Sequence, residues 1–173
     1  VLAIDPATPF FVFDGLRRAM PGVQFINGSS VTASCRMHKS DNEIALIQFA
    51  MDLTLKVQKS AARILEPGIS TIDVQEFLTD AHLKLGTDGP PAFRIVLFGE
   101  PTAYPHGVPY PQELKEGDMV LIDTGATIDG YYSDITRTYV FGEPTTRQSE
   151  IWNLEQAAQV AAFDASQVGT PAE

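Results

Sequence analysis

Residues 117–141 read GDMVLIDTGATIDGYYSDITRTYVF, and the rest of the chain is organised around this stretch. Two strand-like runs, Met119–Thr124 and Tyr131–Phe141, flank a turn that contains Asp129-Gly130. An Asp-Gly pair between two such runs is the strongest short-range sign of a β-hairpin. The stretch therefore predicts an antiparallel ribbon that carries Asp123 in its first strand and Asp134 in its second.

The position of the turn leaves two registers open. If Ile128-Asp129 form the tight turn, Asp123 and Asp134 lie directly opposite each other. If Asp129-Gly130 form it, Asp123 opposes Thr136 and Asp134 is its diagonal neighbour. Both registers place the two carboxylates on one face, roughly 5 to 8 Å apart by strand-pair geometry.

The other face of the ribbon supports this arrangement, because it carries the apolar side chains of a half-buried sheet. These residues are Val120, Ile122, Ile135, Tyr139 and Phe141. A slip of one residue would turn them to solvent, so the pattern fixes which face carries the carboxylates.

Two facing carboxylates repel each other unless one holds a proton or a cation lies between them. Hard divalent cations take oxygen ligands and would remove this repulsion. The pair of Asp123 and Asp134 is therefore a candidate metal site. From the spacing alone, a solvated hairpin with two surface acids remains the alternative.

Composition narrows the possible classes of partner. The 173 residues include 22 acidic and 12 basic ones, which gives a net charge of −10. This balance argues against nucleic acid and against anionic membrane surfaces as partners. Cys35 is the one cysteine, which excludes an internal disulfide. With no apolar run near the roughly 20 residues of a spanning helix and no signal peptide at the start, we expect a cytoplasmic protein.

Helical patterns surround the ribbon. A capping box at Ser40–Glu43 opens a long helix that ends before Pro67-Gly68, and Ser70 or Thr71 caps a second helix that runs to Leu85. Further elements are a helix over Phe10–Met20, a strand over Phe93–Phe98, and a helix from Thr145 or Thr146 to about Ala165. Antiparallel strands with flanking helices indicate an α+β fold.

His106 lies in the proline-rich segment EPTAYPHGVPYPQ, residues 100–112. Proline cannot extend a strand interior or a helix, so this segment is a rigid loop that precedes the ribbon. His106 is either an ordinary loop residue or a positioned proton donor. His38 and His82 lack such a setting and are interpreted as incidental.

The last residues, GTPAE, have the pattern of a helix start, with Thr170 as N-cap and Pro171 at the first helical position. We therefore expect the natural polypeptide to continue beyond Glu173.

Two segments together resemble one family. YPHGVP (104–109) and DTGATIDGYYSDITRTYVFG (123–142) are similar to the first half of a pita-bread metallopeptidase domain, the class of prolidase, aminopeptidase P and methionine aminopeptidase. RMHKSDNE (36–43) resembles the start of the catalytic domain in the proline-specific members. The resemblance implies that residues 1–35 are the end of a creatinase-like N-terminal domain and that residues 36–173 are the first half of the catalytic domain.

The resemblance also implies a role for each site residue. Asp123 would bind one divalent metal ion through both oxygens, Asp134 would bridge two ions, and His106 would donate to the substrate carbonyl or developing oxyanion. Thr136 would not bind metal itself but would hydrogen-bond to a carboxylate ligand or to the metal-bound water. The family completes its site with one His and two Glu from further along the chain, so this chain is expected to be an incomplete, inactive fragment. Oxygen-rich ligation suits Mn²⁺, with Co²⁺ and Zn²⁺ as competitors.

The expected activity is metal-dependent hydrolysis of Xaa-Pro bonds by a hydroxide held between two metal ions, as in prolidase. The substrates would be proline-containing di- or oligopeptides, and the intact protein would be a homodimer. Three alternatives remain: an aminopeptidase P, a methionine aminopeptidase, which the creatinase-like residues 1–35 disfavour, and a non-catalytic pita-bread module that binds peptides.

Overall fold

The computed structural model of the chain describes residues 1–171. Its contacts divide the chain into two compact units, residues 1–45 and residues 46 onward. The division falls within a long helix, α3 (Asp41–Ile64). The sequence-based boundary after residue 35, and the assignment of residues 1–35 to a creatinase-like domain, stay predictions.

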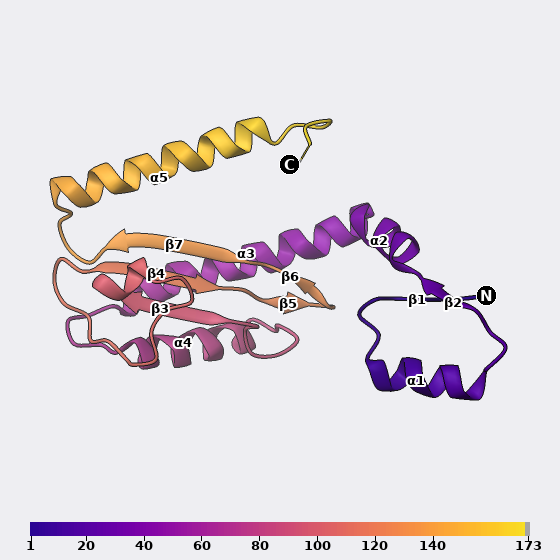
Figure 1. The fold of residues 1–173 in the computed structure, drawn as a ribbon. Helices are drawn as coiled ribbons and strands as arrows, with labels where there is room; N and C mark the ends of the chain where they lie inside the picture. The colour runs from indigo at the N-terminus through magenta and orange to yellow at the C-terminus, as the bar shows by residue number, and fades with distance from the viewer. Residues whose placement is uncertain (172–173) are drawn as a thin grey trace. The chain divides into compact units, whose positions relative to one another are not determined.

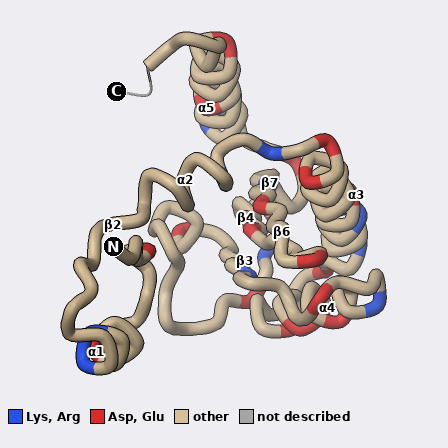
Figure 2. Tube along the Cα trace, turned by 90° about the vertical axis from the view of Figure 1, so that its right-hand side faces the viewer, with Lys and Arg blue, Asp and Glu red and all other residues tan. Residues whose placement is uncertain are grey.

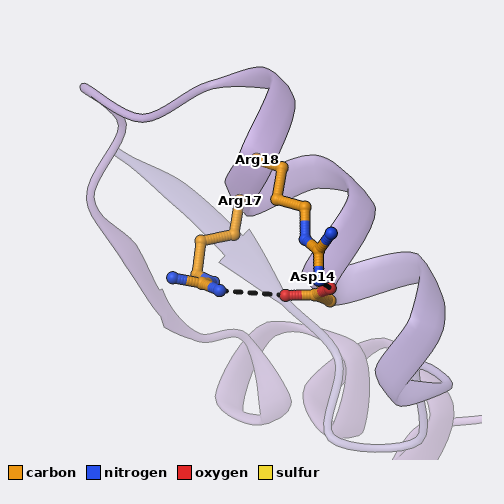
Figure 3. Close-up of polar contacts among 3 residues, drawn as sticks. All are labelled: Asp14, Arg17 and Arg18. Carbon is orange, nitrogen blue, oxygen red and sulfur yellow. Dashed lines mark hydrogen bonds and ion pairs between the residues drawn. The ribbon is translucent and has the colours of Figure 1, made fainter.

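The first unit pairs two short parallel strands, β1 (Leu2–Ile4) and β2 (Phe25–Asn27). Between them runs α1 (Phe10–Ala19), close to the predicted Phe10–Met20, and α2 (Ser29–Met37) follows. On α1 the Asp14 carboxylate contacts Arg17 at 3.0 Å and Arg18 at 2.7 Å (Figure 3). Both arginines are exposed, so these pairs contribute little to stability.

The second unit is built on a three-stranded antiparallel sheet with the order β3-β4-β7 (Figure 1). The strands are β3 (Arg94–Phe98), β4 (Met119–Thr124) and β7 (Ile135–Val140). One face of the sheet packs on α3 and α4 (Thr71–Lys84) and forms the core. Its buried side chains are Val57, Ala61, Val74, Leu78, Val96, Phe98, Leu114, Val120 and Ile122. The apolar face predicted from the sequence is thus the core face.

The helix starts follow the capping patterns in the sequence. The Ser40 and Glu43 side chains bond to each other's backbone N–H groups at the start of α3. Ser70 and Asp73 form a complete capping box on α4, and Thr145 and Gln148 form one on α5 (Thr146–Ala165). Each box satisfies backbone donors that the first helical turn leaves free.

Helices α4 and α5 differ in the charge and the burial of their side chains. Acidic residues follow one another along α4 (Figure 2), while α5 carries apolar residues that stay exposed, among them Leu154 at 73% and Phe163 at 78%. The apolar stripe on α5 therefore does not enter the core of the described residues. Near its start, α5 is tied to β7 by a hydrogen bond from the Trp152 indole N–H to the Thr138 carbonyl, 3.2 Å.

The ribbon is broken where one continuous hairpin was predicted. Beyond β4 the chain forms β5 (Thr127–Ile128), turns, and returns as β6 (Tyr131–Tyr132) before β7. Asp129 and Gly130 both have positive φ, +47° and +80°, as a type I′ turn requires. Residues 125–126 and 133–134 separate the two halves of the ribbon.

Gly125 makes the break possible. A Cβ atom at this position would lie 2.0 Å from the Ser133 carbonyl oxygen, so the two backbones approach too closely for any other residue. Ser133 closes the break from the other strand, because its hydroxyl accepts the Ala126 N–H at 2.8 Å. The pairing keeps one register across the break, since Thr124 opposes Ile135 before it and Thr127 opposes Tyr132 after it.

The tip of the ribbon is held by the loop that follows α4. The Asp88 carboxylate accepts the N–H groups of Asp129 and Gly130, both at 3.0 Å. The Asp88 N–H in turn donates to the Thr127 carbonyl at 2.9 Å. These three bonds hold the turn to the body of the second unit.

The predicted helix start at Thr170 includes Glu173, which lies outside the described residues. Among residues 1–171, no helix combines the length and apolar character needed to cross a bilayer.

We expect Gly125→Ala to destabilise the full-length protein strongly, because the added methyl group meets backbone rather than a movable side chain. Overpacking of this kind typically costs about 1–3 kcal/mol and occasionally more. Gly89→Ala is the matched control, since nothing lies within 4 Å of its added Cβ. Equal denaturation midpoints for the two variants would contradict the close approach.

Burial of His82 makes the stability of the fold depend on pH. The side chain is fully buried, its Nδ1–H donates to the Leu78 carbonyl at 2.8 Å, and its Nε2 has no partner among the described residues. Burial lowers the pKa of His82 below its ordinary value of 6.5, against a smaller opposing effect of the Leu78 bond. Below about pH 6.5 the unfolded chain therefore binds more protons at His82 than the folded chain does. The free energy of unfolding decreases as the pH falls below this value, and His82 imposes no such loss above it.

The measurement is urea denaturation of the protein in chelator between pH 5 and 7.5. His82→Leu should flatten the dependence of the free energy of unfolding on pH over this range, whereas His38→Leu, at an exposed position, should leave it unchanged. An unaltered slope in His82→Leu would contradict the assignment.

Candidate metal centre

Asp123 and Thr136 lie directly opposite each other on β4 and β7. The Thr136 hydroxyl donates to Asp123 Oδ1 at 2.9 Å. This is the second of the two registers that the sequence left open, with the turn at Asp129-Gly130. Thr136 thereby holds one oxygen of the Asp123 carboxylate and restricts its rotation.

Asp134 lies in the break of the ribbon, two residues before Thr136, rather than inside a strand as predicted. Asp134 is the diagonal neighbour of Asp123 across the ribbon, since Asp123 opposes Thr136. Desolvation raises the pKa of Asp134, and the negative charge of the nearby Asp123 raises it further. Asp134 is thus protonated more readily than an ordinary aspartate.

The pair has no positive partner within the described residues. In residues 1–171, no lysine or arginine nitrogen lies within ion-pair distance of Asp123 or Asp134. The same residues contain no group of three or more His, Cys, Asp or Glu side chains suited to hold a metal ion. Two carboxylates and a hydroxyl form an oxygen-only donor set that suits a hard divalent cation. Such a cation would need further ligands.

His106 has a strained backbone. The Gly107 N–H donates to the Tyr104 carbonyl at 3.0 Å, which closes a turn with Pro105 and His106 at its centre. His106 has φ +64°, the value that the third residue of a type II turn adopts and that glycine normally fills. A side chain held in such a conformation costs of order 1–3 kcal/mol and points to a functional constraint.

The loop of His106 lies beside β3. A Cβ atom on the adjacent Gly107 would lie 3.0 Å from the Leu97 side chain. Leu97 opposes Leu121, and Ile95 opposes Asp123, so the side chains of Leu97 and Ile95 share the face of Asp123. His106 and Ile95 both line a hollow of about 280 Å³ at this edge of the sheet. The turn of His106 therefore lies beside β3, the strand next to the one that carries Asp123.

Comparisons with known proteins identify the family of the chain. The family model described as metallopeptidase family M24 matches residues 45–173, which include His106, Asp123, Asp134 and Thr136. A Xaa-Pro dipeptidase of Pyrococcus horikoshii is 30% identical over 172 residues, which is 99% of this chain and 49% of that relative. The YkvY protein of Bacillus subtilis is 36% identical over 154 residues, 89% of this chain and 42% of that relative.

Solved structures of related peptidases superpose on the chain. The prolidase of Pyrococcus horikoshii superposes with a TM-score of 0.88 at 30% identity, over 96% of this chain and 48% of that one. The X-Pro aminopeptidase of Thermotoga maritima superposes with a TM-score of 0.86 at 26% identity, over the same shares of the two chains.

The fold and the matched region together define a pita-bread metallopeptidase domain. The chain belongs to metallopeptidase family M24 and spans about half the length of the relatives it matches. The α+β pita-bread fold predicted from the sequence is confirmed.

Three polar residues that support the site were not predicted. Ser133 closes the break beside Asp134, and Thr54 and Gln58 contact the ribbon from α3. A signal was present, because Thr54 and Gln58 interrupt the apolar side of α3 at a spacing of four residues.

We expect Mn²⁺ to raise the melting temperature of the full-length protein, because a ligand that binds only the folded state stabilises it. At about 100 times its dissociation constant the gain is about 2.7 kcal/mol. Asp134→Asn should remove most of this gain, and in chelator it should be at least as stable as the wild type, because it removes one of two repelling charges.

Asp80→Asn is the matched control, since Asp80 is exposed on α4, away from the ribbon. It should keep the full response to Mn²⁺ in differential scanning calorimetry. A wild-type response in Asp134→Asn would exclude this residue as a ligand.

Proposed function

We propose that the protein hydrolyses Xaa-Pro peptide bonds in proline-containing di- or oligopeptides, with Asp123 and Asp134 as ligands of a pair of divalent metal ions. The observation that carries the proposal is the pair of neighbouring carboxylates, Asp123 and Asp134, which has no positive partner in residues 1–171. The similarity to a Xaa-Pro dipeptidase over 99% of this chain supports the substrate class.

Each residue has a role that its position supports. Asp123 would bind one ion through both oxygens, with Thr136 limiting its rotation, and Asp134 would bridge the two ions. Divalent ions, when bound, lower the pKa of a coordinated water and polarise the substrate carbonyl. Mn²⁺ suits this oxygen-rich donor set best, with Co²⁺ and Zn²⁺ as competitors. Because the described residues supply too few ligands, the activity is proposed for a protein that adds one His and two Glu, and not for these 173 residues alone.

His106 would act on the substrate rather than on the metal ions. The turn of residues 104–107 lies beside β3, and in this proposal the His106 imidazole would donate a hydrogen bond to the oxygen that becomes negative during attack. An Xaa-Pro bond is a tertiary amide with no N–H of its own. The enzyme must therefore recognise it through the carbonyl oxygen and the proline ring.

An aminopeptidase P is the second candidate. The similarity of the fold to the Thermotoga maritima X-Pro aminopeptidase, with a TM-score of 0.86, favours it nearly as strongly as the prolidase likeness favours a dipeptidase. The two activities differ in whether a residue beyond proline is accepted. A cytoplasmic homodimer is part of the proposal in either case.

The test is hydrolysis of Ala-Pro and of Ala-Pro-Ala by the full-length protein with Mn²⁺, with Ala-Ala as the control substrate. A dipeptidase cleaves Ala-Pro, whereas an aminopeptidase P requires the longer peptide. Cleavage should stop when a chelator is added. Failure to cleave either proline peptide under metal titration would contradict the proposal and favour a peptide-binding module without activity.

We further expect His106→Asn to lower kcat about 10²–10³-fold, the usual loss when one donor to a developing oxyanion is removed. Asparagine tolerates the positive φ of this position, so the turn should persist. The Mn²⁺-induced rise in melting temperature should also persist, because His106 is not a metal ligand in this proposal. His38→Asn is the matched control and should retain full activity. A His106→Asn enzyme with wild-type kcat would exclude the donor role.

A further inference from the structure

Helix α3 contacts the ribbon through two buried polar side chains, Thr54 and Gln58, which are 0% and 5% exposed. They lie four residues apart and therefore on one face of the helix. That face is otherwise apolar and packs against the core side of the sheet, opposite the carboxylates.

The Gln58 amide joins the two strands that carry the acidic pair. Its Nε2 donates to the Ile122 carbonyl at 3.0 Å and to the Ile135 carbonyl at 2.9 Å. Ile122 immediately precedes Asp123, and Ile135 immediately follows Asp134. One amide group thus links the backbone beside each carboxylate, from the other side of the sheet.

Thr54 acts at the break of the ribbon. Its hydroxyl lies 2.7 Å from the Ser133 hydroxyl, which also accepts the Ala126 N–H at 2.8 Å. Ser133 immediately precedes Asp134. The hydrogen-bonded chain from Thr54 through Ser133 to Ala126 therefore fixes the backbone from which the Asp134 side chain departs.

Burying the Gln58 amide costs free energy that the packing of its side chain does not explain. The Gln58 Oε1 is buried and has no partner among the described residues. An apolar side chain of similar volume would fill the same space without burying an unpartnered oxygen. The two donors of Gln58 oppose the force that Asp123 and Asp134 exert on each other, since repelling charges on one side of the sheet tend to separate the strands.

We propose that Gln58 and Thr54 are positioning residues of the metal centre, which set the separation of Asp123 and Asp134 through the backbone on the core side of the sheet. The inference depends on the proposed metal-binding function. Neither residue touches metal or substrate.

The test is the affinity for Mn²⁺, measured by isothermal titration calorimetry on the full-length protein well below its melting temperature. Gln58→Met keeps the volume and removes both donors, and we expect about tenfold weaker binding and a lower kcat with little change in KM. Leu53→Ala is the matched control. Leu53 is buried on the same helix and packs against Ile128 in the ribbon, so its loss destabilises the fold but breaks no hydrogen bond beside Asp123 or Asp134.

A second pair of variants keeps the test informative if Gln58→Met fails to fold. Thr54→Val removes the hydroxyl at constant shape and should weaken Mn²⁺ binding, whereas Thr54→Ser keeps the hydroxyl and should restore it. Variants of Gln58 and Thr54 that bind Mn²⁺ as tightly as Leu53→Ala would overturn the inference and leave the proposed function standing. A wild-type protein that binds no Mn²⁺ would overturn both.

Discussion

Electrostatic repulsion between Asp123 and Asp134 is the constraint on which this domain depends. The two carboxylates are diagonal neighbours across the ribbon, and no lysine or arginine in residues 1–171 neutralises them. Desolvation raises the pKa of Asp134, and the charge of Asp123 raises it further. The rest of the second unit must hold the pair together in the absence of a cation.

The ribbon resists that repulsion through its backbone rather than through its side chains alone. Gly125 lets the two strands approach until only a glycine fits, and Ser133 closes the break with its hydroxyl. On the core side, α3 adds hydrogen bonds to the same stretch of chain. The site is thus assembled from both faces of one sheet, with charge on one side and polar groups in an otherwise apolar core on the other.

Local patterns in the sequence predicted the structural features that depend only on residues close together along the chain. The hairpin follows from Asp129-Gly130, the core face from alternation in the two strands, and the helix starts from Ser40, Ser70 and Thr145. The break at Gly125 was missed, because it depends on the close approach of the Ser133 backbone from the other strand. The burial of His82 and the contacts of Gln58 were missed for the same reason, since both depend on elements distant in sequence. The loop of His106 was predicted to be rigid, but its position beside β3 depends on the approach of Gly107 to Leu97.

The three hydrogen bonds of Asp88 have a practical consequence for protein engineering. Surface loops between a helix and a strand ordinarily accept insertions, and they are common sites for epitope tags and grafted peptides. The loop after α4 is a poor choice, because Asp88 is bound to the backbone at the tip of the ribbon. A peptide grafted beside it would release the tip and, through β5 and β6, loosen the acidic pair at the break.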